Sequence, residues 1–160
     1  MSADDYLLRP RDQQEISRLA HQHKVWQKET DAVVQAAGFG PGQHLLDLGC
    51  GPGFLTFDLA KLVKASGSVL AIDTSETFIE YLRREAKSRQ LDWIRAEVAD
   101  LREYDLPPAR YDGAICRWLL MFVAGAEQII TRVAAALPSS SMFAVMEYIN
   151  FRSMSLWPVG

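Results

Sequence analysis

The stretch LLDLGCGPG, residues 45–53, decides the fold of this chain. A short apolar segment runs into three glycines at alternate positions, and a segment with helical spacing follows at once. Glycines leave no side chain between the backbone and a ligand, and the N-terminus of a helix presents free N–H donors. We therefore predict a strand, a ligand-binding turn and a helix in direct succession.

The rest of the chain repeats this alternation. Apolar spacing predicts strands at 44–48, 68–72, 92–98, 111–116 and 142–149, and helices at 54–64, 75–89 and 126–137. Strands that alternate with helices in this way form right-handed βαβ units around a parallel sheet. The prediction is an α/β fold, a Rossmann-like three-layer α-β-α sandwich with a mainly parallel sheet.

The segment before the glycine turn is predicted to be helical. Apolar residues between positions 12 and 37 follow one helical stripe, which either two helices or one bent helix would produce. Thr30 and Asp31 are suitable residues for a second helix start. Residues 1–11 are polar and are expected to form a loosely held arm.

Composition and charge restrict the classes of function. The chain has 160 residues, with 17 Lys and Arg against 20 Asp and Glu, a formal net charge of −3. This balance supplies no basic surface for a nucleic-acid backbone, so we expect no nucleic-acid partner. The N-terminus lacks a secretion signal and the longest apolar run, 118–126, is about half of a membrane span, so we expect a cytoplasmic protein with no membrane partner.

No metal site is predicted. The two cysteines are too few for a disulfide scaffold or a cysteine zinc site. His21 and His23 are two positions apart, so on a helix they point in nearly opposite directions and cannot bind one ion together. We expect Cys116 to be a buried core residue.

The glycine turn departs from the pattern of a dinucleotide site. The pattern G-x-G-x-x-G requires its third glycine at position 54, where this chain has Phe54, and the third glycine comes at Gly53 instead. Asp47 stands at the strand end beside the turn, where its charge disfavours a diphosphate and favours a ligand with a positive charge. No Lys-Ser or Lys-Thr follows the turn, so a P-loop is excluded.

An acidic residue followed by G-x-G-x-G, here Asp47 followed by Gly49, Gly51 and Gly53 with Cys50 between the first two glycines, resembles the first motif of the class I S-adenosylmethionine-dependent methyltransferases. The resemblance extends over about residues 45–146. It implies S-adenosyl-L-methionine as the cofactor and a sheet that lacks the last strands of the family's usual seven. Three explanations are open for the missing strands: a C-terminal truncation, a short natural variant, or a second subunit or other partner that covers the fifth strand; we favour truncation or a partner.

The other strand ends carry residues that the resemblance assigns to the cofactor. Asp73, about twenty residues beyond the turn, would accept from the ribose hydroxyls. Thr74 and Phe78 would flank the adenine, and Asp100 and Leu101 would bind its edge. The backbone near Arg117 would line the methionine end. Local roles remain open for the three carboxylates: a helix cap or a lysine pair for Asp47, a helix cap for Asp73 and a simple turn for Asp100.

A face of the N-terminal helical segment is a second candidate. Arg18, Gln22 and Trp26 share one helical face, and in similar enzymes an N-terminal helix closes over the cofactor. We include Gln22 and Trp26 among the cofactor-binding candidates, with a core position for Trp26 as the alternative. The domain is thus divided into an arm and helical lid, 1–37, and a cofactor-binding methyltransferase part, 38–160.

The predicted function is transfer of a methyl group from S-adenosylmethionine to a small-molecule acceptor by in-line displacement. This chemistry depends mainly on alignment in a dry site, so we assign no catalytic residue. Glu147, Tyr148 and His21 are weak candidates for a base. The alternatives are a non-catalytic S-adenosylmethionine-binding subunit and an NAD-dependent oxidoreductase.

Overall fold

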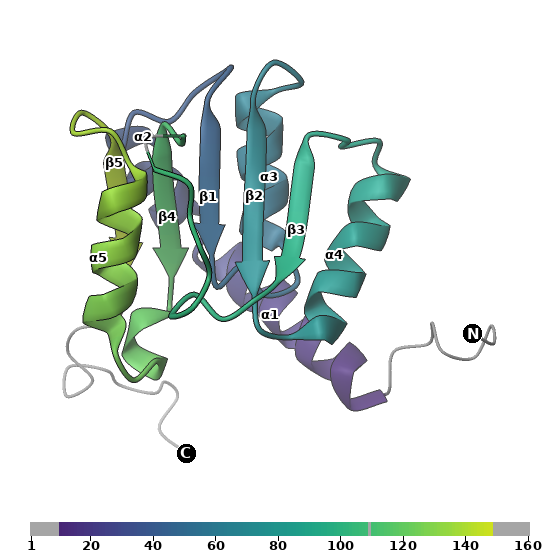
Figure 1. Ribbon diagram of the computed structural model, residues 1–160. Helices are drawn as coiled ribbons and strands as arrows, with labels where there is room; N and C mark the ends of the chain where they lie inside the picture. Colours follow the sequence, from purple (N-terminus) through teal and green to yellow (C-terminus); the bar gives the residue numbers. More distant parts are fainter. Residues whose placement is uncertain (1–9, 109, 149–160) are drawn as a thin grey trace.

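The computed structural model describes residues 10–108 and 110–148 and contains a five-stranded, wholly parallel sheet in the order β3-β2-β1-β4-β5 (Figure 1). Chain order reverses between β1 and β4, and open α/β sheets bind ligands beside such a reversal, at the carboxyl ends of the strands. The strands are β1 (His44–Leu48), β2 (Ser68–Asp73), β3 (Ile94–Val98), β4 (Gly113–Arg117) and β5 (Met142–Met146).

Helices cover both faces of the sheet and make the three predicted layers (Figure 1). The helices α2, α3 and α4 pack on one face, and α5 packs on the other together with the loop that precedes β4. The helix bounds are α1 (Pro10–Val25), α2 (Gln27–Ala36), α3 (Phe54–Val63), α4 (Glu76–Ser88) and α5 (Ala126–Ala136), and a 3₁₀ turn spans Leu120–Phe122.

The alternation of side chains along β1 sets which residues reach each layer. Leu46 and Leu48 face α5, whereas Leu45 faces α3. Asp47 lies on the same side as Leu45, because successive side chains of a strand point to opposite faces. The alternation therefore carries a carboxylate into the layer between the sheet and α3.

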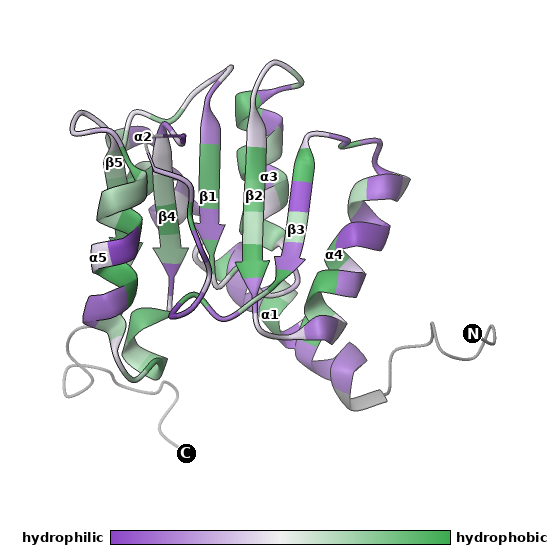
Figure 2. Cartoon of the chain, in the orientation of Figure 1, coloured by the Kyte–Doolittle hydropathy of each residue, from purple (hydrophilic) through white to green (hydrophobic). Residues whose placement is uncertain are grey.

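Packing explains why the residue directly before Phe54 is a glycine, Gly53. It has φ +87° at the start of α3, and a Cβ there would lie 2.3 Å from Cδ1 of the buried Leu82 in α4. This glycine serves the close packing of α3 on α4. The amphipathic α4, apolar toward the sheet and polar outside, completes this contact (Figure 2).

The N-terminal helical segment differs from the prediction in two details. The helix α1 begins at Pro10, inside the predicted arm, and residues 1–9 lie outside the described part of the chain. The segment is two helices, but the second starts at Gln27 and not at Thr30. Thr30 is buried, and its hydroxyl donates back to the carbonyl of Trp26 at 2.7 Å, so it lies within α2 and does not cap it.

Among the described residues, β5 forms one edge of the sheet, with Met142 and Val145 exposed. In the same ranges, no helix has both the length and the apolar character to span a bilayer. No group of His, Cys, Asp and Glu side chains that could hold a metal ion occurs among them either.

Candidate functional site

Two adjoining cavities open at the carboxyl ends of the strands. The first has a volume of about 360 Å³ and lies between α1 and the glycine turn; the second has about 410 Å³ and lies over the ends of β2 and β3. Gly49 and Phe122 line both cavities, and Phe122 is 75% exposed. The arrangement is an elongated site with β1 at its middle.

Most of the predicted residues line these cavities. The first contains Gln22, Asp47, Gly49, Cys50, Gly51, Phe78 and Arg117, and the second contains Gly49, Asp73, Thr74, Asp100 and Leu101. Gly53 and Trp26 line neither. Gly53 packs against α4, as described above, and Trp26 packs edge-on against Trp118 and Tyr148, with ring centroids 5.8 and 5.7 Å away. A direct contact of Gly53 or Trp26 with a cofactor stays a prediction.

Asp47 is the most buried charged side chain of the site, only 2% exposed. The Thr56 hydroxyl of α3 donates to its Oδ2 at 2.6 Å, and among the described residues it has neither the helix amide nor the lysine that a local role would need. Burial raises the pKa of Asp47 to about 6, against the opposing effects of the Thr56 hydrogen bond and the positive charge of Arg117. The fold thus holds a carboxylate that is costly to ionise at the wall of a ligand-sized cavity.

Asp73 joins the end of β2 to the glycine turn. Its Oδ2 accepts from the backbone N–H of Gly51 at 2.8 Å, and its Oδ1 accepts from that of Ser75 at 2.9 Å. Ser75 is the N-cap of α4, with its hydroxyl accepting from the Phe78 N–H. Each Asp73 oxygen keeps capacity for one more hydrogen bond, because a carboxylate has about four acceptor positions.

Asp100 combines a turn role with a place in the second cavity. It accepts from the backbone N–H of Arg102 at 2.9 Å and pairs with the guanidinium of the same residue. These hydrogen bonds lower the pKa of Asp100 to about 2. Beside it the buried Leu101 contributes an apolar wall. A ligand donor that approaches this carboxylate shares it with Arg102.

The helix α1 forms one wall of the first cavity. Glu15, Arg18, Leu19 and Gln22 line it from successive turns, and Arg18 donates to Glu15 and to Gln22. Arg18 and Gln22 thus lie at the cavity wall, and closure of the N-terminal helix over a cofactor stays a prediction. Trp26 instead belongs to an aromatic cluster with Trp118 and Tyr148, and the last two rings stack at 5.4 Å.

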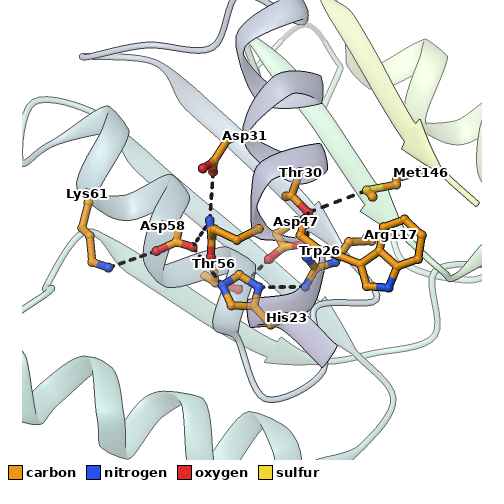
Figure 3. A network of polar contacts seen from close by, with 11 residues as sticks. His23, Trp26, Thr30, Asp31, Asp47, Thr56, Asp58, Lys61, Arg117 and Met146 are labelled. Atoms are coloured by element: carbon orange, nitrogen blue, oxygen red, sulfur yellow. Dashed lines mark hydrogen bonds and ion pairs between the residues drawn. The ribbon is translucent and has the colours of Figure 1, made fainter. Parts of the chain in front are cut away.

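A polar network behind the first cavity was missed in the sequence (Figure 3). Arg117 donates to the Thr30 hydroxyl at 2.9 Å and faces His23 Nδ1 at 3.0 Å, and His23 Nε2 lies 3.0 Å from Asp58 Oδ2. These partners are 35 to 94 positions apart, so no local spacing reveals them. The only signal in the sequence is a polar residue, His23, on the face of the helix that turns away from Arg18.

The two cysteines and the other histidines differ in burial and in position. Cys116 is buried in β4, where burial raises the pKa of its thiol to about 12, and burial likewise raises the pKa of Cys50. Neither thiol is a nucleophile near neutral pH. His44 begins β1, at the opposite end of the sheet from both cavities, and His21 is exposed.

Glu147 holds the loop that shapes the site. Its Oε1 accepts from the backbone N–H groups of Leu119 and Leu120, each at 2.8 Å, and its Oε2 is buried without a partner among the described residues. The loop begins at Trp118, which has φ +56°. This carboxylate therefore fixes the strained segment between β4 and the 3₁₀ turn.

Replacing Glu147 by alanine is expected to lower the free energy of unfolding by about 2–4 kcal/mol, because two backbone N–H groups lose their acceptor. Glu147→Gln keeps an acceptor oxygen at this position and is expected to lose less than half as much. Urea denaturation of both variants measures the difference. Equal losses in the two variants would show that the hydrogen bonds to the loop are not the cause.

Comparison with known proteins gives the following matches. A family model described as a methyltransferase domain matches residues 45–139. A demethylmenaquinone methyltransferase of Symbiobacterium thermophilum is 30% identical over 123 residues, which cover 76% of this chain and 49% of that protein. A 2-phytyl-1,4-naphtoquinone methyltransferase of a Nostoc species is 26% identical over 145 residues, 85% of this chain and 61% of that protein.

The solved structures agree on the fold. The crystal structure of an S-adenosylmethionine-dependent methyltransferase from Aquifex aeolicus superposes with a TM-score of 0.70 at 20% identity, over 79% of this chain and 68% of that one. The present chain spans less than two thirds of the length of the two curated relatives.

Proposed function

The chain belongs to the class I S-adenosylmethionine-dependent methyltransferase family, and from that premise we propose that it transfers a methyl group from S-adenosylmethionine to a small, planar aromatic acceptor. The single observation that carries the proposal is the elongated site, whose two cavities meet at Gly49. One end is lined by carboxylates at the ends of β2 and β3, and the other by Asp47 and Arg117.

The residues of the second cavity, at the ends of β2 and β3, fit a nucleoside. Asp73 keeps free acceptor capacity beside the glycine turn, as two neighbouring ribose hydroxyls require. Asp100 offers an acceptor and Leu101 an apolar surface for a purine ring. We assign these residues, with Thr74, to the adenosine half of the cofactor.

The residues of the first cavity fit an amino acid. Asp47 supplies negative charge for an ammonium group, and Arg117 supplies positive charge for a carboxylate in the same cavity. Gly51 carries no side chain, and a Cβ at this position would have no atom within 4 Å. The space beside the turn is therefore open to a ligand. These features support a role in binding the methionyl half for Asp47, Gly49, Cys50, Gly51 and Arg117, with Gln22 and Phe78 at the cavity wall.

The protein's part in the proposed reaction is alignment and exclusion of water. When bound, S-adenosylmethionine supplies an electrophilic methyl group on a positively charged sulfur. The lining of the first cavity includes aromatic side chains, which would keep the site around such a methyl group dry and favour a cation near their faces. They are Phe54, Phe78, Trp118, Phe122 and Tyr148. No side chain has to move a proton for the methyl group itself to transfer.

The aromatic lining also supports the acceptor class. Flat rings stack favourably on such side chains. The two relatives named above carry quinone-type acceptors in their names, a menaquinone precursor and a phytylnaphthoquinone. We therefore propose a quinol-type ring as the acceptor. A cytoplasmic location, a partner or second copy over β5, and the division at residue 37 stay predictions that accompany this proposal.

The test is product formation by the purified chain with S-adenosylmethionine and a panel of naphthoquinols, catechols and aliphatic alcohols. We expect S-adenosylhomocysteine together with a methylated aromatic product, and no product from the alcohols. Calorimetric titration with S-adenosylhomocysteine and with NAD runs in parallel. Binding of the former without turnover would favour a non-catalytic binding subunit, and preference for NAD would overturn the assignment.

A further inference from the structure

His23 occupies the junction of three elements behind the first cavity (Figure 3). It lies in the last turns of α1, is 9% exposed, and has one ring nitrogen toward Arg117 of β4 and the other toward Asp58 of α3. Its ring also stacks on that of Phe54, with centroids 5.9 Å apart. A side chain with three such contacts has a fixed orientation.

The partners of His23 define where its proton lies. Arg117 has only N–H donors, so Nδ1 must accept the hydrogen bond from this guanidinium at 3.0 Å. Asp58 is ionised: although burial acts to raise its pKa, hydrogen bonds from His23, Lys61 and Gln27 lower the pKa of Asp58 to about 2. Its carboxylate accepts, and therefore Nε2 carries the hydrogen. His23 is held as the neutral Nε2–H tautomer.

Arg117 depends on this arrangement. It is a partly buried cation, and its hydrogen-bond partners among the described residues are two neutral groups, the Thr30 hydroxyl and His23 Nδ1. Its guanidinium also lies over the Trp118 ring, 4.8 Å from the centroid. These contacts fix the direction in which its remaining N–H groups face the cavity.

We propose that His23 is a positioning residue for the cofactor site: as a neutral acceptor it orients the Arg117 guanidinium, and with Asp58 it anchors the end of α1 whose Gln22 lines the cavity. The inference rests on the proposed function. It gives the end of α1 a fixed attachment point. The position of this helix over the cavity and the orientation of the Arg117 guanidinium are then set by the same side chain.

Protonation of His23 would break this arrangement. A hydrogen on Nδ1 would face the N–H groups of Arg117, so the acceptor is lost and two positive charges are adjacent. The charged groups around the ring are Arg117 from β4, Asp47 from β1, and Asp58 with its partner Lys61 from α3, while α2 contributes the neutral Gln27 and Thr30. The hydrogen bond from Arg117 therefore requires that Nδ1 carries no hydrogen.

The experiment compares the affinity of the full chain for S-adenosylhomocysteine by calorimetry at about pH 8, with urea denaturation of each variant alongside. His23→Phe keeps the ring stacking but not the hydrogen bonds, and we expect about tenfold weaker binding. His23→Gln keeps a donor and an acceptor, so we expect affinity within about threefold of wild type. Lys61→Met is the control, because Lys61 is exposed and contacts Asp58 but not His23.

The pair of variants separates positioning from folding. Loss of the ring packing on Phe54 would lower the affinity of His23→Gln more than that of His23→Phe, whereas loss of the acceptor for Arg117 lowers the affinity of His23→Phe alone. Equal binding by wild type and His23→Phe, or equal losses in His23→Phe and His23→Gln, would overturn the role of His23 alone, whereas no binding by the wild type would overturn the proposed function as well.

Discussion

Replacing Asp47 by asparagine is expected to stabilise the folded chain by up to about 3 kcal/mol above pH 7 and to weaken S-adenosylhomocysteine binding roughly tenfold or more. Burial raises the pKa of Asp47 from 3.8 to about 6. At about 1.4 kcal/mol for each unit of pKa difference, ionisation of Asp47 lowers the free energy of unfolding by about 3 kcal/mol. Asparagine keeps an oxygen for the Thr56 hydroxyl and carries no charge.

The pH dependence fixes the sign of the effect. Between about pH 4 and pH 6 the folded chain retains the Asp47 proton that the unfolded chain has released, so wild-type stability falls as the pH rises through this window and then levels off. Asp58 acts in the opposite sense, but its pKa is about 2, so its contribution is lost only as the pH falls below about 4.

Urea denaturation from pH 4.5 to pH 8 and calorimetric titration with S-adenosylhomocysteine measure both parts of this prediction. Glu127→Gln, on the exposed first turn of α5, is a matched loss of one carboxylate away from the site. If the free energy of unfolding of the asparagine variant has the same pH slope as that of the wild type, ionisation of Asp47 does not reduce the stability of the fold. If it is stabilised but binds normally, Asp47 plays no part in cofactor binding.

The element order and the ends of the strands could be predicted from the sequence because they depend on local patterns. The segment 45–48 is apolar except for Asp47, and the three helical stripes have the spacing of helices that pack on a sheet. Once the sheet is parallel, Asp47, Asp73 and Asp100 must lie at or just beyond strand ends along one edge, and the structure places all three at the two adjoining cavities.

Contacts between distant segments could not be predicted in this way. His23 differs from His21 in the sequence only by the helix face that it occupies, and only the packing of α1 on α3 and β4 gives it Asp58 and Arg117 as partners. Trp26 shares a helical face with Gln22, but the break between α1 and α2 turns its ring toward Trp118. Likewise, only the packing of α4 on α3 places Leu82 against Gly53.

Gly51→Ala is expected to weaken S-adenosylhomocysteine binding about a hundredfold while leaving the fold intact. Gly51 has φ +55° and lines the first cavity, and a Cβ there would have no atom within 4 Å. The methyl group therefore meets no protein atom and projects into space that the proposed cofactor needs. The cost to stability is the left-handed backbone alone, about 1–2 kcal/mol.

Gly38→Ala supplies the matched control for this substitution. Gly38 has φ +71°, also has no atom within 4 Å of a Cβ, and lies in the exposed turn between α2 and β1, outside both cavities. The two variants should lose similar stability in urea, because the backbone strain is the same in kind. Only Gly51→Ala should lose affinity by calorimetry, since only its methyl group stands where the backbone must approach the ligand. Similar affinities of the two variants would show that the cofactor does not lie against this turn.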